Sequence, residues 1–317
     1  MPTLSIISCR MLEDEIVHLL SSDREVEELL LLDGKEIQSL SRKLKSQNRP
    51  HIILAWESIG GHIQERRRRP GGLISRRLSR SSRAGGLTVV VSLLPLGLHS
   101  NLELLRNAVY GNIRSHSSFS DGILIFYGKC GNSLVDLEHD FAGLSCPLYF
   151  LKDGQGDRID DCIAAALGGN ENYDRALTEH KDVALFLTPM WASNWKSMGQ
   201  EDASSVRGRD LETMLKGTGM RRVARIDTGL SFEKGCEEKV NDFAREFGLE
   251  RIDLPGGSTV AERSYEQAKR SLLLPASGTR IEMPSDRKSP RPSRCHRKHV
   301  LALCRTAWKK IAGISGQ

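Results

Sequence analysis

Short β-branched and apolar runs alternate along this chain with segments of helical periodicity, and this alternation restricts the fold more than any other feature. The runs, each bounded by turn or helix-start residues, are Thr3–Ser8, His51–Trp56, Leu87–Leu93, Gly122–Tyr127, Pro147–Leu151, Val183–Leu187, Arg222–Ile226 and Arg251–Leu254. The expected helices are Met11–Leu20, Asn101–Ile113, Asp161–Leu167, Glu233–Phe247 and Thr259–Leu272. Strands that alternate with helices need crossover connections. We therefore expect an α/β fold, with a mostly parallel sheet flanked by helices.

The positive charge of the chain is concentrated in two segments. Residues 62–86 carry +7 and residues 275–317 carry +8, so a net charge of +6 leaves −9 for the rest. Residues 62–86 are rich in Arg, Gly and Ser, and we expect a flexible basic insertion there. Residues 275–298 contain four prolines and predict a linker, followed by a basic amphipathic tail helix. That helix either docks on the core or binds a membrane surface or a partner.

The domain organisation follows from these segments. We expect an α/β domain over residues 1–274, with an option of two sub-domains that divide near 150–180, and a basic linker and tail over 275–317.

Several classes of protein are disfavoured by missing patterns. No run of about eighteen apolar residues predicts a transmembrane segment, and the first residues do not resemble a signal peptide. Seven scattered cysteines indicate reduced thiols and a cytoplasmic protein. The sequence contains no phosphate-binding loop, no complete dinucleotide fingerprint, no Cys-x-x-Cys pair and no Gly-x-Ser-x-Gly elbow.

Three cysteines stand where predicted strands give way to helices. Cys9 directly follows the first strand, Cys130 follows the run Gly122–Tyr127, and Cys162 lies at a predicted helix start. In a parallel sheet such junctions lie on one edge, so the three thiols should converge, with sulfur atoms within about 10 Å of one another. A helix N-terminus lowers the pKa of a thiol, which favours a thiolate. Three thiolates suit Zn²⁺ or an iron–sulfur cluster, either with one open position.

Another interpretation treats the same cysteines as small core hydrophobes, since free cysteine is often buried. Two further cysteines, Cys146 and Cys236, are interpreted as core or surface thiols. Four residues of the basic tail also have metal-ligating side chains: Cys295, His296, His299 and Cys304.

Two other side chains are candidates for the same site. His99 follows a strand and a Leu-Pro-Leu-Gly turn, and is either a ligand, a proton donor or a capping or core histidine. Glu15 lies in the helix after Cys9, and either orients a ligand, acts as a general base or forms a surface salt bridge. Trp191 and Trp195, four residues apart, favour core packing over a cofactor platform.

These motifs together resemble a known family, domain-of-unknown-function family 1638. The resemblance extends over residues 3–270. The motifs that carry it are Cys9 with Glu15, Leu94-Pro95 to Leu98-His99, Tyr127 to Asn132, Asp161-Cys162 to Gly168, and Leu187-Thr188-Pro189. It implies recurring cysteines at Cys9, Cys130 and Cys162, a recurring histidine at His99, and an origin among methanogenic archaea and anaerobic bacteria. It also implies corrinoid methyl-transfer proteins as partners. Asp161, where the family often has histidine, and Arg10, where bacterial members often have glycine, depart from the pattern.

Two hypotheses of function follow. The first is a metal- or iron–sulfur-binding enzyme or accessory protein of anaerobic one-carbon metabolism, with Cys9, Cys130 and Cys162 as ligands and His99 and Glu15 beside them. The second is a binding module that uses the arginine-rich insertion and basic tail on nucleic acid or an acidic partner. An aromatic content of 5% and the absence of a recognised nucleic-acid fold argue against nucleic acid.

Overall fold

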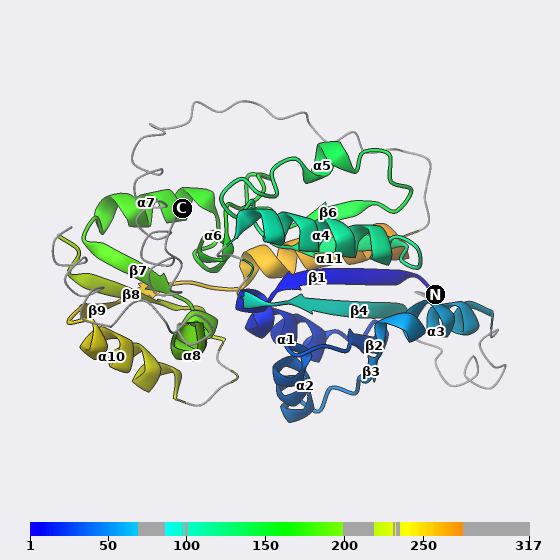
Figure 1. Cartoon of the computed structure of the whole chain (residues 1–317), viewed down its shortest axis with the longest axis horizontal. Helices are drawn as coiled ribbons and strands as arrows, with labels where there is room; N and C mark the ends of the chain where they lie inside the picture. Colours follow the sequence, from blue (N-terminus) through cyan, green and yellow to red (C-terminus); the bar gives the residue numbers. More distant parts are fainter. Residues whose placement is uncertain are drawn as a thin grey trace.

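A computed structural model describes residues 1–68, 86–96, 98, 101–198, 219–230, 232 and 235–274. Within these ranges the chain forms two parallel sheets, each flanked by helices (Figure 1). The expected α/β class is therefore confirmed.

The large sheet has six strands in the order β3-β2-β4-β1-β5-β6, and every neighbouring pair is parallel. Its strands are β1 (Thr3–Cys9), β2 (Val26–Leu32), β3 (Ile52–Leu54), β4 (Leu87–Leu94), β5 (Gly122–Phe126) and β6 (Leu148–Phe150). The helices of this part, which we call the large lobe, are η1 (Arg10–Leu12), α1 (Glu13–Ser22), α2 (Ile37–Ser46), α3 (Trp56–Arg68), α4 (Leu102–His116), α5 (Leu137–Asp140), α6 (Cys162–Ala166) and α11 (Thr259–Leu273).

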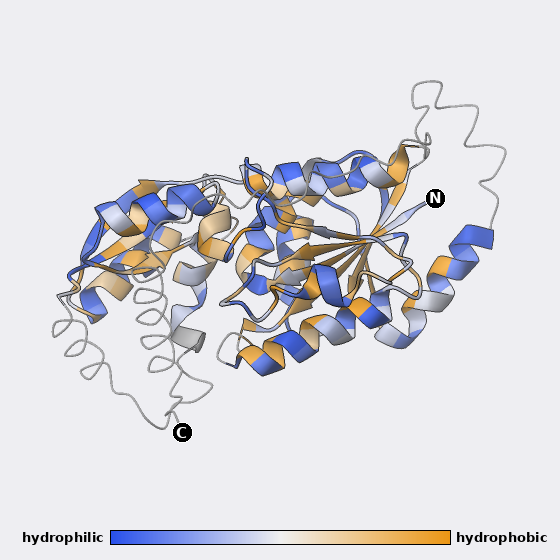
Figure 2. Cartoon of the chain, turned by 90° about the horizontal axis from the view of Figure 1, so that it is seen from above, coloured by the Kyte–Doolittle hydropathy of each residue, from blue (hydrophilic) through white to orange (hydrophobic). Residues whose placement is uncertain are grey.

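Helices cover both faces of the large sheet, because its central strands are apolar on both sides. Leu4 and Ile6 of β1 pack with α1, α2 and α11, whereas Ile7 packs with α4 on the opposite face. Helix α3 covers β2 and β4 through Ile59 and Ile63. Figure 2 shows the result, in which the apolar strands lie between helices whose outer faces are hydrophilic.

A second sheet of three parallel strands, in the order β7-β8-β9, forms the small lobe. Its elements are α7 (Asn170–Glu179), β7 (Val183–Leu187), α8 (Pro189–Met198), β8 (Arg222–Asp227), α10 (Cys236–Glu246) and β9 (Glu250–Pro255). The chain then returns to the large lobe as α11, which lies beside β1 and β5 (Figure 1).

Several elements differ from the sequence expectations. Strand β2 is not among the predicted runs, because its acidic start and four leucines are typical of a helix, and only burial between β4 and β3 makes it a strand. Helices α2 and α7 are also additional. Residues 62–68 are not part of a loop but complete α3, since Ile63 is buried against the sheet. The rest of the expected insertion, residues 69–85, and the tail 275–317 lie outside the described residues.

No helix in the described ranges is both long enough and apolar enough to span a membrane.

Candidate functional site

Cys9 is the last residue of β1, and the backbone turns there into η1. Its sulfur accepts a hydrogen bond from the backbone N–H of Met11 at 3.4 Å, and the side chain is only 2% exposed. Because β1 is a central strand of the large sheet, this thiol lies at the middle of the carboxyl edge.

Cys130 reaches the same edge because the loop after β5 passes very close to the loop before α6. A Cβ on Gly128 would lie 2.6 Å from backbone atoms of Asp160 and Asp161, so only glycine permits this approach. The backbone N–H of Cys130 then donates to the carbonyl of Asp160 at 2.7 Å. Cys130 itself has φ of +44°, a left-handed conformation that costs a non-glycine residue about 1 kcal/mol.

Cys162 is the first residue of α6, and Asp161 caps that helix. The Asp161 carboxylate accepts hydrogen bonds from the backbone N–H groups of Ile163 and Ala164, both at 2.9 Å. Cys162 is more exposed than the other two cysteines, which makes it the most accessible thiol of the three.

Electrostatic interactions link these three thiols to one buried phenol. The charge of Tyr127 interacts with those of Cys9, Cys130 and Cys162. Each pair of the three cysteines also interacts electrostatically. We call Cys9, Cys130 and Cys162 the thiol site.

The protonation of these thiols differs from the sequence expectation. Burial raises the pKa of Cys9 to about 12, and burial also raises the pKa values of Cys130 and Cys162 well above the usual thiol range. The expected lowering by a helix N-terminus is wrong for Cys162, because α6 has only five residues and Asp161 already occupies its free N–H groups. Without a cation, the site therefore holds neutral thiols.

Glu15 lies beside this site and is buried, with 4% of its surface exposed. Its Oε2 atom has no hydrogen-bond partner, and its charge acts on Cys9. Burial, together with the charge of the nearby Asp14, raises the pKa of Glu15 to about 8. The surface salt bridge considered from sequence is wrong, because Glu15 is buried. A buried carboxylate with one oxygen that lacks a hydrogen bond is rare and costly.

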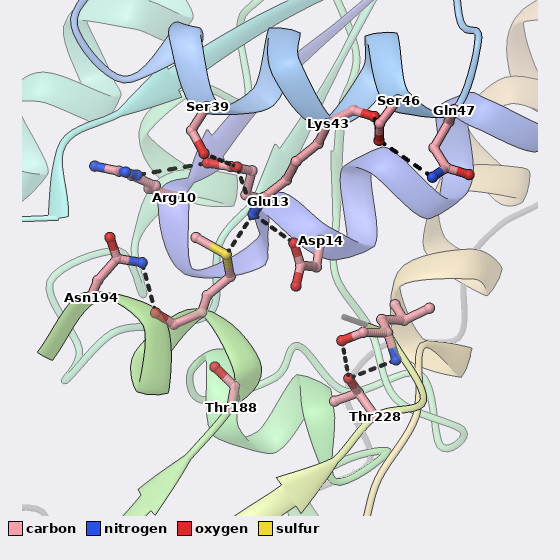
Figure 3. A network of polar contacts seen from close by, with 12 residues as sticks. Arg10, Glu13, Asp14, Ser39, Lys43, Ser46, Gln47, Thr188, Asn194 and Thr228 are labelled. Carbon is pink, nitrogen blue, oxygen red and sulfur yellow. Dashed lines mark hydrogen bonds and ion pairs between the residues drawn. The ribbon is translucent and has the colours of Figure 1, made fainter. Parts of the chain in front are cut away.

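The two acids before Glu15 are neutralised by a buried lysine. Lys43 of α2 is 1% exposed and pairs with Glu13 and Asp14, both at 2.8 Å (Figure 3). Burial opposes the charge of Lys43, but these carboxylates still raise its pKa. The Nζ of Lys43 also lies 3.1 Å from the sulfur of Met190, so this network reaches the small lobe.

Arg158 is a second buried cation close to the thiols. Its guanidinium stacks on Phe150 at 4.2 Å and donates to the carbonyls of Leu134 and Val135 at 2.8 and 3.2 Å. Its positive charge acts on Cys130. Arg158 therefore fixes the loop that carries Cys130 and brings a positive charge beside the thiol.

The two tryptophans of α8 pack into the core. The Trp191 ring packs against the cores of both lobes. Trp195 packs on Phe243 and Phe247 inside the small lobe. The expectation of core packing is therefore confirmed for both residues.

The remaining candidates fall into three groups. Cys146 lies at the opposite edge of the sheet, where burial and the charge of Asp121 raise its pKa. Cys236 is the first residue of α10. Asp227 forms a turn by accepting a hydrogen bond from the backbone N–H of Gly229. The others lie outside the described residues: His99, Cys295, His296, His299 and Cys304.

The side-chain positions do not form a ready metal centre. Among the described residues, no three His, Cys, Asp or Glu side chains lie close enough to hold a metal ion as they stand. The sulfur–sulfur separations expected from sequence stay a prediction.

A comparison with protein families identifies the chain. The family model described as "Protein of unknown function (DUF1638)" matches residues 93–265, which is 173 of the 317 residues. The chain belongs to this family. The match includes Cys130 and Cys162 and begins after Cys9 and Glu15, so it is shorter than the resemblance over 3–270. No curated protein and no solved structure matches the chain.

Proposed function

We propose that this protein binds a metal ion on the thiolates of Cys9, Cys130 and Cys162, and that the ion is zinc. The observation that supports the proposal is the mutual electrostatic interaction of three cysteines, which lie at the end of β1, in the loop after β5 and at the start of α6.

The chemistry of the donors supports zinc over a cluster. Three thiolates fill three positions of a tetrahedral zinc ion, and Glu15 offers a carboxylate oxygen, a common zinc ligand, for the fourth. Its unpartnered Oε2 atom is the polar group that a cation would satisfy. An iron–sulfur cluster takes its protein ligands mainly from thiolates and would leave this carboxylate unexplained.

Binding would need a local rearrangement. Since the side chains do not stand within metal-binding distance, the thiols would have to rotate toward a common point. A cation would also reverse the effect of burial on the thiols, since metal binding deprotonates them.

The residues around the ion define what chemistry it would serve. A zinc ion held by three thiolates keeps a bound thiol deprotonated at neutral pH. When a substrate thiol binds, Glu15 would give up the fourth position on the zinc ion and would accept the proton that the thiol loses. Arg158 would balance the negative charge near Cys130. We propose methyl transfer to a thiol as the reaction class, with corrinoid methyl-transfer proteins as partners, because the family resemblance implies one-carbon metabolism.

Metal analysis tests the proposal. The protein is purified without oxygen, and zinc, iron and sulfide are measured for the wild type and for Cys9→Ser, Cys130→Ser, Cys162→Ser and the control Cys146→Ser. We expect about one equivalent of zinc in the wild type and the control, with loss in the other three. Less than about half an equivalent of any metal, unchanged by the three substitutions, would refute the proposal. Iron with sulfide would establish a cluster instead.

A further inference from the structure

The large sheet ends on one side at β3, and the outer edge of this strand is apolar (Figure 1). Among the described residues, seven large apolar side chains are exposed, and three of them lie in or beside β3: Ile52 at 44%, Ile53 at 37% and Trp56 at 39%. Edge strands of proteins that stay monomeric usually carry charges or bulges at such a place, because a free edge pairs readily with another chain. This edge is therefore a candidate interaction surface.

The backbone of Ile53 is the part of β3 that a new strand would meet. The carbonyl of Leu54 faces β2, since it accepts a hydrogen bond from the backbone N–H of Asp33 at 2.8 Å. Successive residues of a strand point their backbone groups in alternate directions, so the N–H and C=O of Ile53 point away from β2. The side chains alternate as well. Leu54 packs with the cluster under α3, and Ile52 shares its face, whereas Ile53 lies on the opposite face.

Charges at the two ends of the strand indicate which partner fits. Arg49 precedes Ile53 by four residues, and its guanidinium donates to the carbonyl of Val26 at 2.7 Å, which fixes the positive charge beside the edge. Glu57 follows Ile53 by four residues and is exposed in the first turn of α3. A segment that is positive at its start and negative at its end complements a copy of itself that runs in the opposite direction.

We propose that β3 pairs with β3 of a second copy of this chain, antiparallel and about a two-fold axis that passes between the two Ile53 residues. In this register the two Ile53 residues exchange both backbone hydrogen bonds, and their side chains face each other. Ile52 of each protomer lies opposite Leu54 of its partner, and Arg49 comes beside Glu57 of its partner. The interface is isologous and joins two six-stranded sheets into one.

This inference does not depend on the proposed metal site. Cys9 belongs to β1, and both β4 and β2 lie between β1 and β3. Failure of the metal site would therefore leave the dimer untouched, and the reverse also holds.

Sedimentation velocity of the full chain tests the dimer. We expect the wild type to dimerise with a Kd of about 1–10 μM, in keeping with a small interface. Ile53→Lys should weaken association at least about a hundredfold, because the axis sets two like charges against each other. The control Leu104→Lys, at a side chain 55% exposed on α4, should behave as the wild type. A wild type that stays monomeric at about 100 μM, or a dimer that persists in Ile53→Lys, would overturn the proposal.

A second variant distinguishes a lost interface from a lost fold. Ile53→Glu alone should also be monomeric, for the same reason as Ile53→Lys. An equimolar mixture of the two variants should form a heterodimer, because opposite charges then face each other across the axis. A mixture that stays monomeric, while the circular dichroism of both variants matches the wild type, would overturn this register.

Discussion

Replacing Lys43 by methionine should remove a large part of the stability of this protein. Lys43 is 1% exposed and is the partner of Glu13 and Asp14, which are also buried. Methionine preserves most of the side-chain volume, so the change isolates the charge. It removes the nearest cation from both carboxylates and leaves Glu13 with Arg10 at 3.6 Å, beside Glu15, which already has an unpartnered oxygen.

The magnitude follows from the cost of breaking a buried ion pair. Removing one partner typically costs 3–5 kcal/mol, because the other charge stays buried and uncompensated. One lysine serves two carboxylates at 2.8 Å here, so we expect about 4–5 kcal/mol. That is about a quarter or more of the free energy of unfolding of a typical domain, which is roughly 5–15 kcal/mol.

Urea denaturation at pH 7 and pH 5 measures this loss. Protonation of a carboxylate at lower pH removes its uncompensated charge, so the deficit in the free energy of unfolding should shrink at pH 5. Lys45→Met, on the exposed face of the same helix, should change stability by less than about 0.5 kcal/mol. A deficit below about 1 kcal/mol in Lys43→Met at pH 7 would refute the electrostatic account.

Three further predictions concern other parts of the chain. Burial lowers the pKa of His116 from 6.5 to about 3, so folding keeps this histidine neutral. The free energy of unfolding should therefore be highest above pH 6.5 and should fall as the pH drops toward 3. The loss should reach about 3 kcal/mol at pH 4.5. The free energy of unfolding of His116→Gln, measured by denaturation, should not show this fall with pH. An identical pH dependence in the variant and the wild type would contradict the prediction. Gly128→Ala should destabilise the protein by about 2 kcal/mol or more and abolish metal binding, whereas Gly60→Ala, with open space around its Cβ, should do neither. Deleting residues 69–85 and 275–317 should leave metal content unchanged; loss of the metal would assign those segments to the site.

The sequence predicts the sheet because its strands depend on local signals. Short β-branched runs followed by helices require crossovers, which give a parallel sheet. The same reasoning places Cys9, Cys130 and Cys162 at one edge, and the separations of their sulfur atoms stay a prediction. Strand β2 escapes prediction because its leucines and glutamates are helix formers, and its two buried faces come from neighbours that lie far away in sequence.

The surroundings of the thiols depend on contacts between distant elements. Three acids at the start of a helix are typical of a solvated first turn. Glu13, Asp14 and Glu15 are buried because Lys43 arrives from α2, a helix that the sequence pattern does not reveal. Trp191 lies on α8 of the small lobe, and no periodicity in that helix predicts that its ring also packs against the core of the large lobe.

X-ray absorption at the zinc edge of the anaerobically purified protein tests the central claim most directly. We expect three sulfur atoms at about 2.3 Å and one lighter atom at about 2.0–2.2 Å. In Glu15→Gln the sulfur count should stay at three while the lighter ligand changes. A spectrum with only nitrogen and oxygen ligands, or one unaltered in Cys130→Ser, would contradict a zinc site built on these thiols.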